Sequence, residues 1–219
     1  MADAISASAA TAAVARVAKR MAGQREYLTQ LDAAVGDGDL GLTIAKGSAA
    51  LQDYLAANDP GDDLGKFIAG MGMAFNRAAS STMGTLIATA LMRAGREARG
   101  SSTLEAETLA QMFRAADAGI QERGKAKLGD KTIVDALHPA AEAFAAAIDQ
   151  GDPLRAAGQA ALEAAREGRD AVIPLRSRIG RAAWVGERTE GQPDPGTVLF
   201  VRILEALLEA DYSEPGSTG

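Results

Sequence analysis

Three aspartates and three glycines are concentrated in one short stretch near the start of the chain. The stretch contains Asp32, Asp37 and Asp39 together with Gly36, Gly38 and Gly41. Asp and Gly both disfavour helix interiors, so the stretch is predicted to be a loop. Carboxylates this close repel one another unless a cation lies among them, and hard oxygen ligands suit Mg²⁺ or Ca²⁺ better than zinc. The spacing therefore predicts a divalent metal site.

Residues 42–46, directly after this loop, read as the first turns of a helix. The start of a helix offers free backbone N–H groups and a positive dipole end, both of which favour phosphate. Loop and helix start together predict a Mg²⁺–nucleotide site. A plain helix–turn–helix connection with a capping Asp is the alternative. An EF-hand is excluded, because its twelfth position needs a carboxylate, and counting from Asp32 or Asp37 reaches Thr43 or Ser48.

Composition points to an all-α protein. The 219 residues are rich in Ala, only 4% are aromatic, and no stretch alternates with period two for long. Cysteine is absent, which excludes disulfides, a thiol nucleophile and a Cys zinc site. The net charge of −6 argues against a general nucleic-acid binder. The N-terminal sequence lacks the basic start of a signal peptide and no apolar run is long enough to cross a membrane, so we expect a cytoplasmic location.

Apolar residues recur at helical spacing in eight segments, with mostly short connections between them. Short connections make consecutive helices antiparallel neighbours, so we expect one domain over 1–219, frayed at about 1–5 and 213–219. The eight segments lie within 14–31, 44–55, 64–75, 86–91, 109–120, 133–148, 154–165 and 198–208.

The connection over 169–195 is long, and it contains Arg181 and Trp184. Connections of this length without a helix of their own are usually functional or disordered. This one is too apolar for a plain linker, and we interpret it as an ordered loop that closes over a site.

The remaining chemistry favours phosphoryl transfer. The single histidine, His138, lies inside a helical segment and is interpreted as structural, and no Walker motif or His-based triad is present. Phosphoryl transfer needs little beyond metals, phosphate donors and positioning. Residues 80–85, Ser-Ser-Thr-Met-Gly-Thr, offer hydroxyl and backbone donors, and Arg181 offers positive charge. A capped helix start and a solvated arginine are the alternatives for these two features.

Four blocks, in order, make the chain similar to the nucleotide-binding L subunit of bacterial dihydroxyacetone kinases. The first is the acidic loop, in which Asp39-Leu40-Gly41-Leu42-Thr43 stands where the family commonly has Asp-His-Gly-Thr-Asn. The second is 80–85, where the family has a Gly-rich phosphate loop, so that Met83 makes this loop bulkier. The others are Gly-Asp-Lys-Thr at 129–132 and a C-terminal signature at 180–196 that ends in Asp194-Pro195-Gly196.

The resemblance implies an eight-helix antiparallel barrel with a nucleotide, ADP or ATP, at one end. It implies that Asp32, Asp37 and Asp39 bind two Mg²⁺ ions and that Arg181 stabilises charge. It places two further groups around the nucleotide: Leu40, Gly41, Leu42, Thr43, Ser81 and Thr82 at the phosphates, and Gly124, Ile133, Arg181, Asp194, Pro195 and Gly196 around the rest.

The resemblance also implies partners. In the family a separate K subunit holds the ketose on a histidine, and phosphate crosses the subunit interface. In one branch a phosphotransferase-system protein rephosphorylates bound ADP, whereas in another ATP is an exchanging substrate. Dihydroxyacetone or a related short ketose such as erythrulose is the expected acceptor. A non-catalytic regulatory module of the same fold is the alternative function, and formation of a homodimer stays open.

Overall fold

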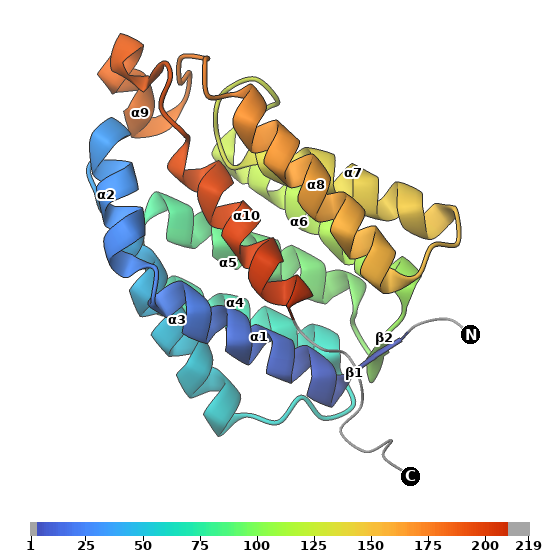
Figure 1. Ribbon diagram of the computed structural model, residues 1–219. Coiled ribbons are helices and arrows are strands. Elements are labelled where there is room, and N and C mark those ends of the chain that lie inside the picture. Colours follow the sequence, from blue (N-terminus) through green and yellow to red (C-terminus); the bar gives the residue numbers. More distant parts are fainter. Residues whose placement is uncertain (1–3, 210–219) are drawn as a thin grey trace.

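The computed structural model describes residues 4–209, which are almost entirely helical (Figure 1). The described part contains ten α-helices, one 3-10 helix and two strands of two residues each. These are β1 (Ile5–Ser6), α1 (Ala7–Ala22), α2 (Arg25–Val35), α3 (Leu40–Ala57), α4 (Leu64–Ala78), α5 (Thr82–Glu97), β2 (Thr103–Leu104), α6 (Ala106–Gly124), α7 (Val134–Asp149), α8 (Leu154–Ala171), α9 (Gly180–Val185), η1 (Gly186–Thr189) and α10 (Pro195–Leu208).

The all-α prediction is confirmed, with two more helices than the periodicity indicates. The first predicted helix is divided at Gly23 and Gln24, because the C-terminal cap of α1 at Gly23 ends its hydrogen-bond ladder before α2 begins. The other addition is α9, a helix of six residues inside the long connection. Ile5, expected in the frayed start, pairs with Leu104 in a short antiparallel ribbon. The expectations for 1–3 and 213–219 lie outside the described residues.

Eight of the helices contact one another in a closed order. Proceeding along the chain, α1 contacts α3, and each of α3 to α7 contacts the next helix; α10 then contacts both α8 and α1. Figure 1 shows α7 and α8 side by side, joined by a tight turn. This order of neighbours is compatible with the barrel, which stays a prediction.

The core consists of aliphatic, methionine and small side chains. One buried cluster joins α1 to α5 and includes Leu28, Leu64 and Met71; a second joins α6, α7, α8 and α10 and includes Val134 and Val201. The side chains of these clusters lie on the helix faces that the apolar spacing predicts to be buried. They hold the helix ends in place, so that the loops at one end of the molecule are positioned by a rigid scaffold.

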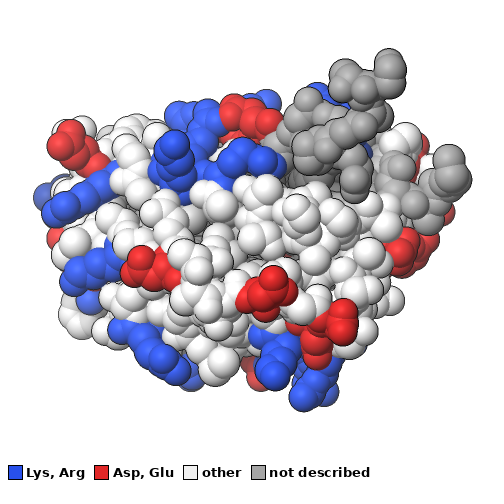
Figure 2. Space-filling view, turned by 90° about the horizontal axis from the view of Figure 1, so that it is seen from below, with Lys and Arg blue, Asp and Glu red and all other residues white. Residues whose placement is uncertain are grey.

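The surface seen from below (Figure 2) mixes Lys and Arg with Asp and Glu around a broad uncharged area. The described residues on this face therefore form no continuous basic surface of the kind that nucleic-acid binders use. Between residues 4 and 209, none of the helices combines the length and the apolar character needed to span a membrane.

Candidate nucleotide and metal site

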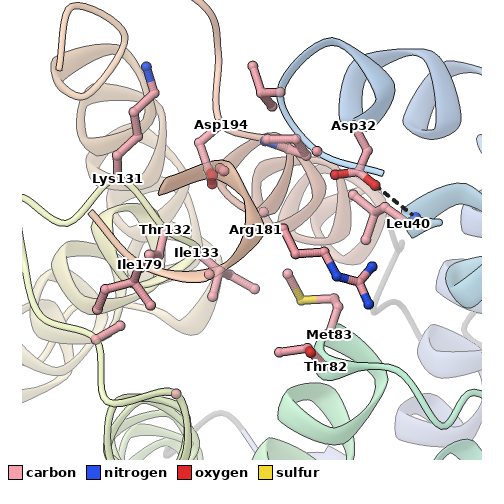
Figure 3. Close-up of a pocket in the computed structure, with 18 of the residues that line it drawn as sticks. Asp32, Leu40, Thr82, Met83, Lys131, Thr132, Ile133, Ile179, Arg181 and Asp194 are labelled. Carbon is pink, nitrogen blue, oxygen red and sulfur yellow. Dashed lines mark hydrogen bonds between the residues drawn. The ribbon is translucent and has the colours of Figure 1, made fainter. Parts of the chain in front are cut away.

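A pocket of about 440 Å³ lies where the loop between α2 and α3 meets α9 and the ends of four long helices (Figure 3). Acidic side chains line one side, and apolar side chains line another. The residues that line it are Asp32, Val35, Gly36, Asp37, Asp39, Leu40, Thr82, Met83, Leu86, Ile120, Gly124, Ala126, Lys131, Thr132, Ile133, Val134, Ile179, Gly180, Arg181, Ala182, Trp184, Asp194, Pro195 and Gly196.

The acidic side is formed by Asp32, Asp37 and Asp39. One carboxylate oxygen from each lies within 4.8 Å of the others. Asp32 comes from the last turns of α2, and its carboxylate accepts a hydrogen bond of 3.2 Å from the Leu40 N–H at the start of α3 (Figure 3). Burial, and next the charge of Asp32, raise the pKa of Asp39 above its ordinary value. The effect of Asp32 shows that this cluster concentrates negative charge, and oxygen ligands so arranged fit a hard divalent cation.

Two glycines shape the acidic loop. A Cβ at Gly36 would lie 2.7 Å from Asp32 Oδ1, so a side chain here would push the Asp32 carboxylate aside. Gly38 has φ +76°, in the left-handed region that favours glycine. Substitution of either would strain the loop that brings the three carboxylates together.

Arg181 provides the positive charge that faces this cluster. Its guanidinium forms ion pairs with Asp37 and with Asp39, the latter at 3.1 Å. The residue belongs to α9, so the long connection does fold back onto the acidic loop. In this structure the guanidinium marks where positive charge is favourable between the two carboxylates.

Four long helices present their N-terminal ends to the pocket. Their first residues, which all line it, are Leu40 of α3, Thr82 of α5, Val134 of α7 and Pro195 of α10. Each end carries the partial positive charge of its helix dipole, although capping groups already accept hydrogen bonds from several first-turn N–H groups, among them those of Leu40, Gly84 and Thr197. Convergence of four such ends makes this part of the pocket suited to an anion with several oxygens, such as a diphosphate.

The opposite side of the pocket is apolar. Met83, Leu86, Ile120, Ala126 and Ile133 line it, with Gly124 at the end of α6. A flat heteroaromatic ring fits between such side chains, because apolar walls recognise its faces.

Asp194 lies beside this region and is 8% exposed. It caps α10 by accepting a hydrogen bond of 2.7 Å from the Thr197 N–H. Burial is the main cause that raises the pKa of Asp194 to about 7.

Most of the site residues expected from the sequence line this one pocket. The exceptions are Gly41, Leu42, Thr43 and Ser81. The Thr43 hydroxyl donates a hydrogen bond of 2.9 Å to Ser81 Oγ, which also accepts one from the Gly84 N–H. These two side chains thus join the start of α3 to the start of α5, and their predicted role at the phosphates stays a prediction.

Sequence reasoning missed Lys131 as a pocket residue. The residue lies in the Gly-Asp-Lys-Thr block that carries part of the resemblance, and this block was the available signal. His138 lies outside the pocket lining. Its Nδ1 is 2.7 Å from Asp117 Oδ2, a contact that links α7 to α6 and agrees with the structural interpretation.

Comparison with known proteins gives the family. The DAK2 domain model matches residues 34–209. The chain belongs to the DAK2 domain family. Two relatives of this family are ADP-binding DhaL subunits of PEP-dependent dihydroxyacetone kinases. The subunit from Escherichia coli (strain K12) is 34% identical over 84% of this chain and 88% of its own. That of kinase 2 from Listeria innocua is 32% identical over 85% and 86%.

A solved structure agrees with the DAK2 assignment. The dihydroxyacetone kinase from C. freundii, crystallised in complex with AMP-PNP and Mg²⁺, superposes with a TM-score of 0.68 at 25% identity. The similarity covers 92% of this chain, which spans about a third (33%) of that kinase.

Proposed function

We propose that this chain is the nucleotide-binding subunit of a dihydroxyacetone kinase and that it passes a phosphoryl group from bound Mg²⁺-nucleotide to a ketose held by a partner. The observation that carries the proposal is the convergence of three carboxylates and four helix N-termini on one pocket. The E. coli relative is named as an ADP-binding subunit, and the C. freundii kinase was crystallised with AMP-PNP and Mg²⁺, so both support this function.

The carboxylates of Asp32, Asp37 and Asp39 would together hold two Mg²⁺ ions. Magnesium there would neutralise charge on the phosphate oxygens during transfer. The starts of α3 and α5 would hold the phosphates through backbone N–H groups, and the dipoles of α7 and α10 would add positive potential. Arg181 is close enough to the same carboxylates to stabilise charge that develops at the transferring group. The apolar wall that includes Gly124 and Ile133 would hold the base.

The acceptor comes from a second protein in this proposal. The chain has a single histidine, and His138 is tied to Asp117 away from the pocket lining, so no histidine of this chain is placed to capture a ketose. A K subunit that holds the ketose must therefore reach the pocket mouth. The donor is either exchanging ATP or a phosphotransferase-system protein that rephosphorylates bound ADP.

The described surface around the mouth suits such docking. Trp184 lines the pocket and is 93% exposed. Three further exposed large apolar residues follow pocket residues closely in the chain or contact them: Leu42 after Leu40, Leu128 after Ala126, and Leu175, whose carbonyl accepts a hydrogen bond from Lys131. An exposed tryptophan at the pocket, with further exposed apolar residues close to pocket residues in the chain, is a feature that a protein partner could cover.

Titration calorimetry of Mg²⁺ and ADP into the purified protein tests the nucleotide site. We expect binding to the wild type and none to Asp37→Asn, because that variant removes one of the three metal carboxylates. Asp63→Asn, at the exposed start of α4, is the matched control and should bind normally. Unchanged affinity in Asp37→Asn would refute the assignment of the acidic loop.

A coupled turnover assay with a K subunit and dihydroxyacetone tests the transfer. Phosphorylation of the ketose is the expected result. Metal-dependent binding without any turnover would instead favour the regulatory module. Mass spectrometry of the native protein distinguishes the donors, since retained ADP indicates the phosphoprotein branch.

A further inference from the structure

Residues 173–191, which we call the cap segment, connect α8 to α10 and carry α9 and η1. The two ends of the segment are held together at its base. The Gly191 N–H donates a hydrogen bond of 2.9 Å to the Ile173 carbonyl, and the Ser177 N–H donates one of 3.0 Å to Thr189 Oγ1. Thr189 is 0% exposed, so this base is a packed and ordered structure.

Lys131 lies directly at this base. The residue is 2% exposed and has φ +61°, in the left-handed region. Its ammonium donates hydrogen bonds to the carbonyls of Ile173 (2.9 Å), Leu175 (2.8 Å) and Thr189 (2.5 Å). An ammonium group has three N–H donors, so the three carbonyls use all of them.

These contacts exclude a direct role for Lys131 as a phosphate ligand in this arrangement. Figure 3 shows its side chain directed away from Arg181, although its stem lines the pocket. Burial lowers the pKa of Lys131, whereas the charges of Asp194 and then Glu190 raise it. A buried cation that is fully used on backbone carbonyls is suited to hold a segment in place.

The tip of the cap segment is attached to a different part of the molecule. There Arg181 forms ion pairs with Asp37 and Asp39, and α9 contacts α2. The segment is therefore held at its base by the loop between α6 and α7 and at its tip by the acidic loop. Any movement of the base would change where Arg181 lies relative to the carboxylates.

We propose that Lys131 is a positioning residue of the nucleotide site: by fixing the base of the cap segment, its ammonium holds Arg181 and α9 over the metal carboxylates. The inference rests on the proposed nucleotide-binding function. It assigns to Lys131 an effect on ligand affinity that is transmitted through Arg181.

Lys131→Met tests this, because methionine keeps most of the stem and removes the ammonium. Lys127→Met, in the same loop but with an exposed side chain, is the matched control. We expect Mg²⁺-ADP affinity to fall roughly 10-fold in Lys131→Met, the lower end of the range for groups that hydrogen-bond a metal ligand directly, because Lys131 acts on Arg181 through the backbone of the cap segment. Affinity should be unchanged in Lys127→Met.

A double-mutant cycle with Arg181→Ala separates positioning from general destabilisation. If Lys131 acts through Arg181, Lys131→Met should cost little further affinity in the Arg181→Ala background. If the fold-losses in Mg²⁺-ADP affinity of the two single variants multiply in the double variant, the proposal is overturned. If Lys131→Met does not fold, Lys131→Gln, which keeps a shorter donor, goes through the same cycle.

A measurement without nucleotide distinguishes failure of this inference from failure of the proposed function. Trp184 is the only tryptophan and lies on α9, so its time-resolved fluorescence anisotropy reports motion of the cap segment. We expect a larger amplitude of local motion in ligand-free Lys131→Met than in the wild type and in Lys127→Met. Equal anisotropy in all three proteins would overturn the role of Lys131, whereas a wild type that binds no ADP would overturn only the nucleotide function and the affinity effect that rests on it.

Discussion

Asp194 gives the protein an unusual dependence of stability on pH. Burial raises the pKa of this carboxyl group to about 7 from its ordinary value of 3.8. The hydrogen bond from the Thr197 N–H opposes the shift, the charge of Asp135 adds to it, and the charge of Lys131 opposes it. The folded protein therefore keeps a proton on Asp194 at pH values where the unfolded chain has lost it.

The sign and the size of this pH dependence follow from the number of protons that the folded and the unfolded states bind at each pH. Between about pH 4 and pH 7 the folded state binds more protons than the unfolded state, so this contribution to stability is complete below pH 4 and is lost as pH rises to 7. A shift of about 3 units at 1.36 kcal/mol per unit corresponds to about 4 kcal/mol. Asp194→Asn removes the titration and keeps a side-chain oxygen that is well suited to cap α10.

Urea unfolding of both proteins from pH 4 to pH 8, with EDTA and without nucleotide, measures the effect. We expect Asp194→Asn to gain stability relative to the wild type as pH rises, by about 4 kcal/mol in the free energy of unfolding over the whole window.

An exposed cap provides the control. Asp63 caps α4, and hydrogen bonds from the Gly100 and Lys66 N–H groups lower its pKa. Ionised Asp63 stabilises the folded protein above its ordinary pKa, and this stabilisation is lost as pH falls. Asp63→Asn lacks it, so the variant should become less stable relative to the wild type as pH rises from acid values. A constant difference between Asp194→Asn and wild type at every pH would refute the reasoning about burial.

Three further outcomes follow from the packing and the site. Gly41→Ala should lower the free energy of unfolding by about 3 kcal/mol or more, because its Cβ would lie 2.1 Å from the Arg25 carbonyl oxygen. Gly124→Ala, whose Cβ would lie 3.5 Å from Leu86, should keep a free energy of unfolding within about 1 kcal/mol of the wild type, and it should bind ADP more weakly because Gly124 lines the pocket. Leu28→Ala, at a fully buried site, should lower the free energy of unfolding by about 2–5 kcal/mol in urea. Leu128→Ala, at an exposed position two residues after Ala126 of the pocket, should leave stability within about 0.5 kcal/mol and weaken capture of the K subunit. With ADP at 100 times its dissociation constant, EDTA should remove about 3 kcal/mol of stability measured by thermal melting, and no change on chelation would contradict a metal-dependent site.

Local patterns determined a large part of this protein. The acidic loop with Gly36 and Gly38 and the apolar spacing of the long helices both depend on neighbours within a few residues. The sequence therefore predicts them directly, and the structure confirms the helical class. The short helix α9 was missed because six residues carry too little periodicity to distinguish a helix from an ordered loop.

Tertiary structure alone decided which of these local features meet. The convergence of four helix N-termini, the pairing of Thr43 with Ser81 and the contact of Arg181 with Asp37 join residues that are far apart in the chain. Lys131 is the clearest case, because its ammonium binds carbonyls 42 to 58 residues away. Residue spacing encodes helix faces and caps, whereas contacts at this separation depend on how the completed helices pack, and no local pattern carries that information.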